Sequence, residues 1–584
     1  MNIKSVATIA LLCITTTAMA KQPKTVTIRL IETSDVHGAF FPYNFMEQQP
    51  MKGTMARVST YVNKQRKIYG QNLILVDNGD ILQGQPTCYY SNFINTAQPN
   101  IAAEVINYLN YDAEAFGNHD VETGHAVYDK WIRELKCPTL GANIIDNKTN
   151  KPYVKPYIIL EREGVRIAIL GMLTPAIPNW LHERLWSGLH FEEMVSSARK
   201  WVKHLKEQEQ ADVIVGLFHS GWDGGITTPD YDEDATKKVA EQVEGFDVIF
   251  YGHDHTERME QMPNGVLCLD PSCNAVKVAQ ATIKLKVKNE KSKNSKGRKQ
   301  SVVIVEKLGE IVDITGEEID QQYVSHFQAS IDSVRNFVEQ RLGTFTETVR
   351  ASDAFFGSAP FTDIIHKIQL EETKADVSFV APLTFNSDIK AGPVYMSDMF
   401  KLYRYENLIY SLRMTGREIR KHLEMSYGLW TNTMKSPDDH IMLIEERSFN
   451  DYQRLGFKNL TFNFDSAAGI NYEVDVTKPE GQKVRILQLS DGRPFDEDAW
   501  YHVAMNSYRG NGGGELLTRG AGIPADSIPA RIEFMSELDL RHYLTKMIQR
   551  EGNVVPKALN NWRFVPQEWT APALVRDRQL IFGR

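Results

Sequence analysis

The sequence predicts an α/β domain over residues 21–320, a linker helix over residues 321–344 and an α+β domain over residues 345–584. In the first domain, short apolar runs alternate with helix-like segments, which is the pattern of a layered α/β fold. In the last domain, helix and strand patterns are mixed without regular alternation. The chain has 584 residues, enough for several domains of about 100–200 residues each.

The strands expected in the first domain are continuous apolar runs, which is typical of strands that are covered on both faces. They lie at residues 26–30, 73–76, 167–170, 213–217 and 248–251, with helices expected at 101–109 and 194–205. Residues 323–342 have helical spacing, with Gly343 at the end, which predicts one helix between the two domains. The last domain has a helix pattern at 416–427 and a strand pattern at 501–505.

Composition and charge limit the partners. The chain has 66 Lys and Arg against 74 Asp and Glu, and no run of basic residues is long enough to bind along a polyanion such as a nucleic acid. We therefore expect no long nucleic acid as a partner, and the sequence indicates no protein partner. No segment has the roughly 20 apolar residues that a membrane span needs.

Residues 1–20 have the pattern of a signal peptide, with a basic Lys4, an apolar stretch at 9–14 and Ala-Met-Ala at 18–20. Cleavage would leave Lys21 first, and the mature protein is expected to be periplasmic or secreted. In such an oxidising compartment, Cys268 and Cys273 are close enough in sequence to form a disulfide, although two buried free thiols fit equally. Cys88 and Cys137 have no close partner in sequence.

Five polar motifs follow apolar runs or short turns in the first domain. They are Asp35-Val36-His37, Gly79-Asp80, Gly117-Asn118-His119-Asp120, His219, and Gly252-His253-Asp254-His255. Because residues beyond the carboxyl ends of neighbouring strands meet at one edge of a sheet, we expect these side chains to converge. Carboxylate, amide and imidazole donors without thiolate suit Zn, Mn or Fe at a hydrolytic centre. By contrast, four histidines have no such setting and are expected to be surface or packing residues: His125, His182, His190 and His204.

The order of these motifs resembles that of the calcineurin-like metallophosphoesterases. The resemblance implies a four-layer αββα domain that holds two divalent metal ions, Zn, Mn or similar. It assigns one ion to Asp35, His37, Asp80 and His255, and the other to Asp80, Asn118, His219 and His253. Asp80 would then bridge the two ions.

Two such ions lower the pKa of a shared water and hold the phosphoryl oxygens during in-line displacement. His119 is similar to the family's histidine that contacts the phosphoryl group, and it would assist the leaving group. A carboxylate is needed to orient this imidazole. Glu122, three residues later, and the adjacent Asp120 are both candidates.

The last domain is similar to the C-terminal domain of the 5'-nucleotidase family. The resemblance lies in residues 355–360, 381–386, 402–407 and 414–418, and the nearest subgroup is the periplasmic 2',3'-cyclic-nucleotide 2'-phosphodiesterase/3'-nucleotidases. Many 5'-nucleotidases have a phosphate-binding Gly-Gly-x-Arg element where this chain has Thr-Phe-Asn-Ser-Asp at 384–388. They also favour Gly-Gly-Asp where this chain has three glycines at 512–514.

Both departures favour a phosphohydrolase of small exported-space nucleotides that opens 2',3'-cyclic nucleotides and then removes the 3'-phosphate, by attack of a metal-bound hydroxide. On this interpretation Tyr405 and Tyr508 stack on the nucleobase, and Asn407 lies beside them in the substrate site. A 5'-nucleotidase or nucleotide-sugar hydrolase is the alternative within the same class. A non-catalytic periplasmic nucleotide-binding protein is the alternative from another class, but it would be expected to lack metal ligands, and all seven are present.

Overall fold

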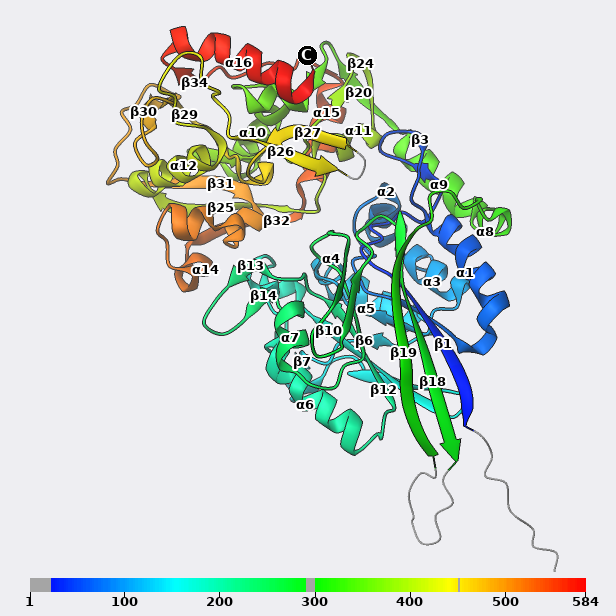
Figure 1. Cartoon of the computed structure of the whole chain (residues 1–584). Coiled ribbons are helices and arrows are strands. Elements are labelled where there is room, and N and C mark those ends of the chain that lie inside the picture. Colours follow the sequence, from blue (N-terminus) through cyan, green and yellow to red (C-terminus); the bar gives the residue numbers. More distant parts are fainter. Residues whose placement is uncertain (1–22, 290–299, 450–451, 584) are drawn as a thin grey trace, which may run out of the picture.

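Two six-stranded sheets form the centre of the N-terminal domain in a computed structural model, which describes residues 23–289, 300–449 and 452–583 (Figure 1). One sheet has the order β19-β18-β1-β4-β5-β6 and the other β16-β17-β15-β12-β10-β9. The first consists of β1 (Lys24–Thr33), β4 (Leu73–Asp77), β5 (Ala113–Ala115), β6 (Thr139–Leu140), β18 (Lys277–Asn289) and β19 (Gln300–Asp313). The second consists of β9 (Tyr157–Arg162), β10 (Val165–Leu173), β12 (Val213–His219), β15 (Val248–Tyr251), β16 (Arg258–Gln261) and β17 (Leu267–Asp270).

The two sheets pack face to face, and helices cover both outer faces. Alternate residues of β1 and β12, such as Ile28 and Val215, belong to one buried cluster between the sheets. Helices α1 (Met55–Tyr69), α3 (Ile101–Leu109) and α5 (His125–Glu134) cover the first sheet, and α6 (Met194–Glu207) and α7 (Thr236–Gln242) cover the second. The predicted αββα fold is therefore confirmed. Because the central strands, such as β4, β12 and β15, are buried on both faces, they are nearly continuous apolar runs.

The C-terminal domain is built on a five-stranded sheet with the order β28-β22-β31-β25-β32. Its strands are β22 (Val377–Val380), β25 (Leu408–Thr415), β28 (Ser466–Ala468), β31 (Trp500–Asn506) and β32 (Ile532–Asp539). Helices α10 (Pro360–Thr373), α12 (Gly416–Trp430) and α16 (Gln567–Phe582) belong to the same domain. Helix α12 begins where predicted because the Thr415 hydroxyl accepts from the Glu418 N–H, while the Glu418 carboxylate accepts from the Thr415 N–H.

The linker differs from the single helix that the sequence predicts. It contains α8 (Gln321–His326) and α9 (Gln328–Val338), which are separated at Phe327, followed by strand β20 (Arg341–Phe345). The Phe327 ring is buried and packs 5.9 Å from that of Phe41. Gly343 lies in β20, where a Cβ would come within 2.8 Å of Ile548 in α15 (Leu540–Glu551). Gly343 therefore permits close packing instead of ending a helix.

Two hydrogen bonds between the domains involve residues that line a shared cavity. The Tyr89 hydroxyl donates to Asp539 Oδ2 at 2.9 Å, and Asn511 Nδ2 donates to the Trp180 carbonyl at 3.0 Å. Elsewhere, Cys268 and Cys273 are free thiols, so the disulfide alternative is wrong. None of the helices within the described ranges is long and apolar enough to cross a membrane. The predicted signal peptide lies outside those ranges.

Candidate dimetal site

The seven predicted ligands lie at or beyond the carboxyl ends of strands from both sheets. Six of them follow β1, β4, β5 and β15, and His219 is the last residue of β12. Asn118 is the first residue of α4 (Asn118–Glu122). Five of them have left-handed backbone angles: Asp35 (φ 49°), His37 (48°), Asp80 (55°), His253 (83°) and His255 (56°). Such angles are uncommon outside glycine and cluster at functional sites. The local backbone is therefore strained where it turns these side chains toward one another.

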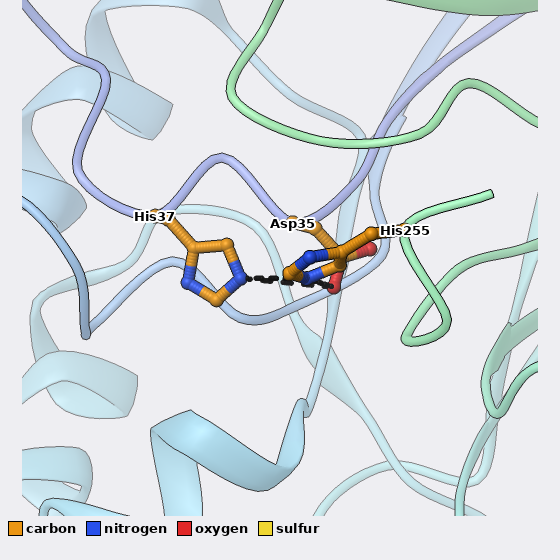
Figure 2. A group of neighbouring side chains, drawn as sticks. All are labelled: Asp35, His37 and His255. Carbon is orange, nitrogen blue, oxygen red and sulfur yellow. Dashed lines mark hydrogen bonds and ion pairs between the residues drawn. The ribbon is translucent and has the colours of Figure 1, made fainter. Parts of the chain in front are cut away.

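Asp35, His37 and His255 form the first group (Figure 2). The Nε2 atoms of His37 and His255 are 2.9 Å apart, and Asp35 Oδ1 is 3.3 Å from His255 Nε2. Asp35 Oδ2 accepts from the Ser34 hydroxyl and the His253 N–H, whereas the fully buried Oδ1 has no hydrogen-bond partner. One carboxylate oxygen is thus left facing two imidazole nitrogens.

Asp80, His219 and His253 form the second group, and Asn118 lies between its two histidines. Asn118 Oδ1 is 3.0 Å from His219 Nε2 and 2.8 Å from His253 Nδ1. His219 Nδ1 donates to the Asn78 carbonyl at 2.7 Å, which leaves the Nε2 lone pair of the neutral ring facing into the group. Unshared electron pairs therefore converge, which is an arrangement that a cation can stabilise.

Asp80 lies between the two groups. Its Oδ2 is 3.2 Å from His219 Nε2 and 4.0 Å from His37 Nε2, while Oδ1 accepts from the His119 N–H at 2.8 Å. Gly117 makes this approach possible, because a Cβ there would lie 2.1 Å from Asp80 Oδ1. Asp80 therefore lies close to a histidine of each group.

The charges of the site fit a pair of divalent cations. Burial alone would raise the pKa of Asp80, but His219 and His119 hold that pKa well below its usual value. Burial lowers the pKa of His219, yet the Asp80 and Asp35 carboxylates raise it to about 10. The carboxylates and imidazoles of the two groups thus interact strongly with one another. Carboxylate, imidazole and amide donors are ligands of Zn, Mn and Fe, so the residues present fit the ions implied by the sequence.

His119 lies at the edge of this group with Glu122 as its partner. The two are joined by a 2.6 Å hydrogen bond between Nδ1 and Glu122 Oε2. Burial lowers the pKa of His119, but the Asp80 carboxylate and the Glu122 hydrogen bond raise it to about 9. Asp120 has a different position, because its carboxylate accepts from the N–H groups of Asp80, Ile81, Leu82 and Gly117. Asp120 therefore holds the loop that carries Asp80, and Glu122 contacts the imidazole.

A cavity of about 750 Å³ opens beside His119 and is lined by both domains. Tyr405, Asn407 and Tyr508 line it from the C-terminal domain. The Tyr405 ring is nearly parallel to that of His119, with centroids 6.5 Å apart. Tyr403, two residues earlier, is buried in the core instead. The three residues that the sequence assigns to substrate thus share a cavity with Asn118 and His253.

Several cavity residues were not assigned to the site from the sequence. Trp180 has its ring 5.7 Å from that of His253, and His182, expected to be a surface or packing residue, lies 6.2 Å from Tyr410. Phe462 reaches the cavity from a short turn. Glu233 Oε1 lies 3.2 Å from His253 Nε2. Together with Asp234, these residues form a third group of potential metal ligands. The acidic run at 232–234 was the available signal, whereas the others follow no periodic pattern.

Known proteins resemble the chain over nearly its whole length. Residues 28–257 match the calcineurin-like phosphoesterase family, and residues 341–519 match the 5'-nucleotidase C-terminal domain. The 2',3'-cyclic-nucleotide 2'-phosphodiesterase/3'-nucleotidase of Haemophilus influenzae is 26% identical over 94% of this chain and 89% of that protein. A Vibrio cholerae 5'-nucleotidase is 24% identical over 73% and 80%, respectively. The crystal structure of a 5'-nucleotidase precursor from Thermus thermophilus superimposes with a TM-score of 0.61 over 92% of this chain and 99% of that one, at 18% identity.

Proposed function

Because this chain is a metal-dependent phosphoesterase of the 5'-nucleotidase family, we propose that it opens 2',3'-cyclic nucleotides to 3'-nucleotides and dephosphorylates these to nucleosides. One observation carries the proposal. The cavity has Asn118, His119 and His253 on its N-terminal side and two tyrosines with Asn407 on its C-terminal side. These two sides are complementary to a nucleotide, because its anionic phosphate suits the metal side and its flat base suits the tyrosines.

The charged side of the cavity supports phosphoester hydrolysis. When bound, two divalent ions activate water and neutralise charge on the phosphoryl oxygens. The imidazole of His119, held at Nδ1 by Glu122, presents Nε2 as the proton donor to the departing ribose oxygen. Asp120 keeps the Asp80 loop in place through four backbone hydrogen bonds. Tyr405 and Tyr508 provide aromatic faces for the base.

The distribution of positive charge favours a substrate with a single phosphate. Arg184 is the one Lys or Arg side chain among the described residues that line the cavity. The segment 384–388 lacks the arginine that many 5'-nucleotidases have there. None of its residues lines the cavity. A nucleotide sugar would bring a second phosphate that finds little charge to pair with. The charge distribution supports a mononucleotide over the nucleotide-sugar alternative. The preference for a cyclic or 3'-nucleotide over a 5'-nucleotide is supported by the sequence at 384–388 and 512–514.

The test is a comparison of rates on 2',3'-cAMP, 3'-AMP and 5'-AMP with added Mn or Zn. The proposal expects turnover of the first two and much slower hydrolysis of 5'-AMP. Preferential hydrolysis of 5'-AMP would instead support a 5'-nucleotidase, the activity named for the similar Vibrio cholerae enzyme. Nucleotide binding without any turnover would support the non-catalytic alternative.

We also infer that the protein acts outside the cytoplasm, either in the periplasm or secreted. The support is the pattern of residues 1–20. Sequencing the N-terminus of the mature protein tests this inference, because cleavage after Ala20 would leave Lys21 as the first residue. A mature chain that begins at Met1 would contradict it.

A further inference from the structure

A short hairpin reaches the proposed metal site from the second sheet. It consists of β13 (Gly224–Thr227) and β14 (Asp232–Asp234) and follows the ligand His219 in sequence. We propose that Glu233 of this hairpin is a positioning residue that orients the ligand His253 and fixes which of its ring nitrogens faces the metal. The inference rests on the proposed dimetal site, in which His253 is a ligand.

The geometry around the His253 ring assigns a different task to each nitrogen. Nδ1 is 2.8 Å from Asn118 Oδ1, inside the second ligand group. Nε2 is 3.2 Å from Glu233 Oε1, outside that group. A carboxylate accepts hydrogen bonds, so the proton of a neutral ring is held on Nε2, and Nδ1 keeps its lone pair. A ligating histidine usually donates its other N–H to such a partner, which increases the basicity of the ligating nitrogen.

Glu233 is itself firmly held. Its second carboxylate oxygen accepts from the Ile226 N–H at 2.6 Å, across the hairpin. Its carbonyl accepts from the hydroxyls of Thr174 and Ser220, at 2.9 Å and 2.8 Å. The Glu233 and His253 side chains are only 15% and 12% exposed, so water competes weakly for their hydrogen bond. The hairpin therefore acts as a support for the ligand and not as a free surface loop.

Gly225 supplies a second and independent sign of this arrangement. It has a φ of +62°, and a Cβ at this position would lie 2.5 Å from Glu233 Cδ and 2.6 Å from Oε2. A side chain at Gly225 would displace the carboxylate from His253. Asp234 is a weaker neighbour, because its Oδ1 is 3.9 Å from His253 Nε2 and accepts from the Gly221 N–H.

Glu233, Asp234 and His253 are also close enough together to hold a third cation. That arrangement would require Nε2 to give up its proton while Nδ1 binds the second metal, which would leave the ring an anion. A hydrogen bond from Nε2 to Glu233 satisfies both groups with a neutral ring. The two possibilities predict different metal contents, two or three ions per chain.

The test measures metal content and metal affinity in the full chain, by titration of Zn or Mn against a competing chelator. The variants are Glu233→Ala, Glu233→Gln and Gly225→Ala. Asp232→Asn is the matched control, because Asp232 lies in the same strand but pairs with Lys238 at the surface. Thermal unfolding of the metal-free proteins checks that each variant folds.

We expect Glu233→Ala and Gly225→Ala to lower the metal affinity of one of the two sites by about 10–100-fold. This is the usual effect of losing a hydrogen-bond partner of a metal-binding histidine. Glu233→Gln keeps an acceptor oxygen and should recover part of this loss, and Asp232→Asn should match the parent. Parental affinity in Glu233→Ala, no recovery in Glu233→Gln, or three ions in the parent would each overturn the inference. A parent that binds no metal would instead refute the proposed dimetal site.

Discussion

Glu122→Gln tests the catalytic assignment most directly, because it removes one charge and changes the side chain's size very little. Glu122 Oε2 is 2.6 Å from His119 Nδ1, and both side chains are largely shielded from water. Hydrogen bonds to a charged group contribute about 1.5–3 kcal/mol, and each 1.4 kcal/mol corresponds to a factor of ten in rate. If the bond is stronger in the transition state than in the ground state, kcat should fall by about 10–100-fold.

The pH profile adds a second measurement with a definite sign. The Glu122 carboxylate is one of the groups that raise the pKa of His119. Its neutralisation lowers that pKa, so the imidazolium loses its proton at lower pH. The alkaline limb of kcat, where the proton donor is lost, should therefore move to lower pH in Glu122→Gln. The assay is kcat and KM on 3'-AMP from pH 5 to about pH 11, a range that extends past the His119 pKa of about 9. Metal content is measured in parallel and is expected to be parental.

Asp120→Asn is the comparison that could refute this reasoning. Because Asp120 accepts four backbone N–H bonds around Asp80, its loss should lower the unfolding temperature and the metal content. The reasoning fails if Glu122→Gln keeps the parental kcat and pH profile. It fails completely if, in addition, Asp120→Asn loses kcat with stability and metals intact, since Asp120 would then orient His119.

Three further predictions concern the ligands, the base and the C-terminal core. Asp80→Ala should abolish phosphoesterase activity and lower bound metal, because one carboxylate serves both groups; two metals and near-parental turnover would contradict the ligand assignment. Tyr508→Ala should raise KM for 3'-AMP severalfold or more but spare bis(p-nitrophenyl) phosphate, which has no base to stack; equal losses on both would make Tyr508 structural. Burial lowers the pKa of His366 to about 3 in the folded protein, whereas a histidine in the unfolded chain has a pKa of about 6.5. Between these two pH values only the unfolded chain binds the proton, so the free energy of unfolding falls as the pH drops from about 6.5 toward 3. In His366→Gln, the decrease in unfolding temperature from pH 7 to pH 5 should therefore be smaller, and an unchanged decrease would contradict this account.

The strands and the convergence of the polar motifs were accessible to sequence reasoning for one physical reason, whereas the assignment of each ligand came from the family resemblance. A strand buried on both faces is largely apolar, so polar residues that follow it mark the strand's end and the sheet's edge. Asp35, Asp80 and His253 each lie two or three residues after such a strand. Glycines beside them mark places where the backbone passes too close for a side chain, as Gly117 does against Asp80.

Other features depend on how distant segments meet, which no local pattern encodes. The division of the linker at Phe327 follows from packing against Phe41, which lies far earlier in the chain. His182 reaches the cavity because its segment approaches Tyr410 of the other domain. The choice between Glu122 and Asp120 was open in the sequence because both are within three residues of His119. Their hydrogen bonds separate them, since only Asp120 faces backbone N–H groups.

The division of the site between two domains bears on how a nucleotide could be selected. Stacking on Tyr405 and Tyr508 would read the face of a base and tolerate several bases, while the metal groups would bind any phosphoryl group. Neither element alone distinguishes a 3'-phosphate from a 5'-phosphate. On the proposed function, that distinction must come from the span between the tyrosines and the metals, which the relative position of the domains sets. The hydrogen bonds from Tyr89 to Asp539 and from Asn511 to Trp180 join the two domains at the cavity. Changes at these contacts should therefore alter the preference between phosphate positions before they alter metal binding.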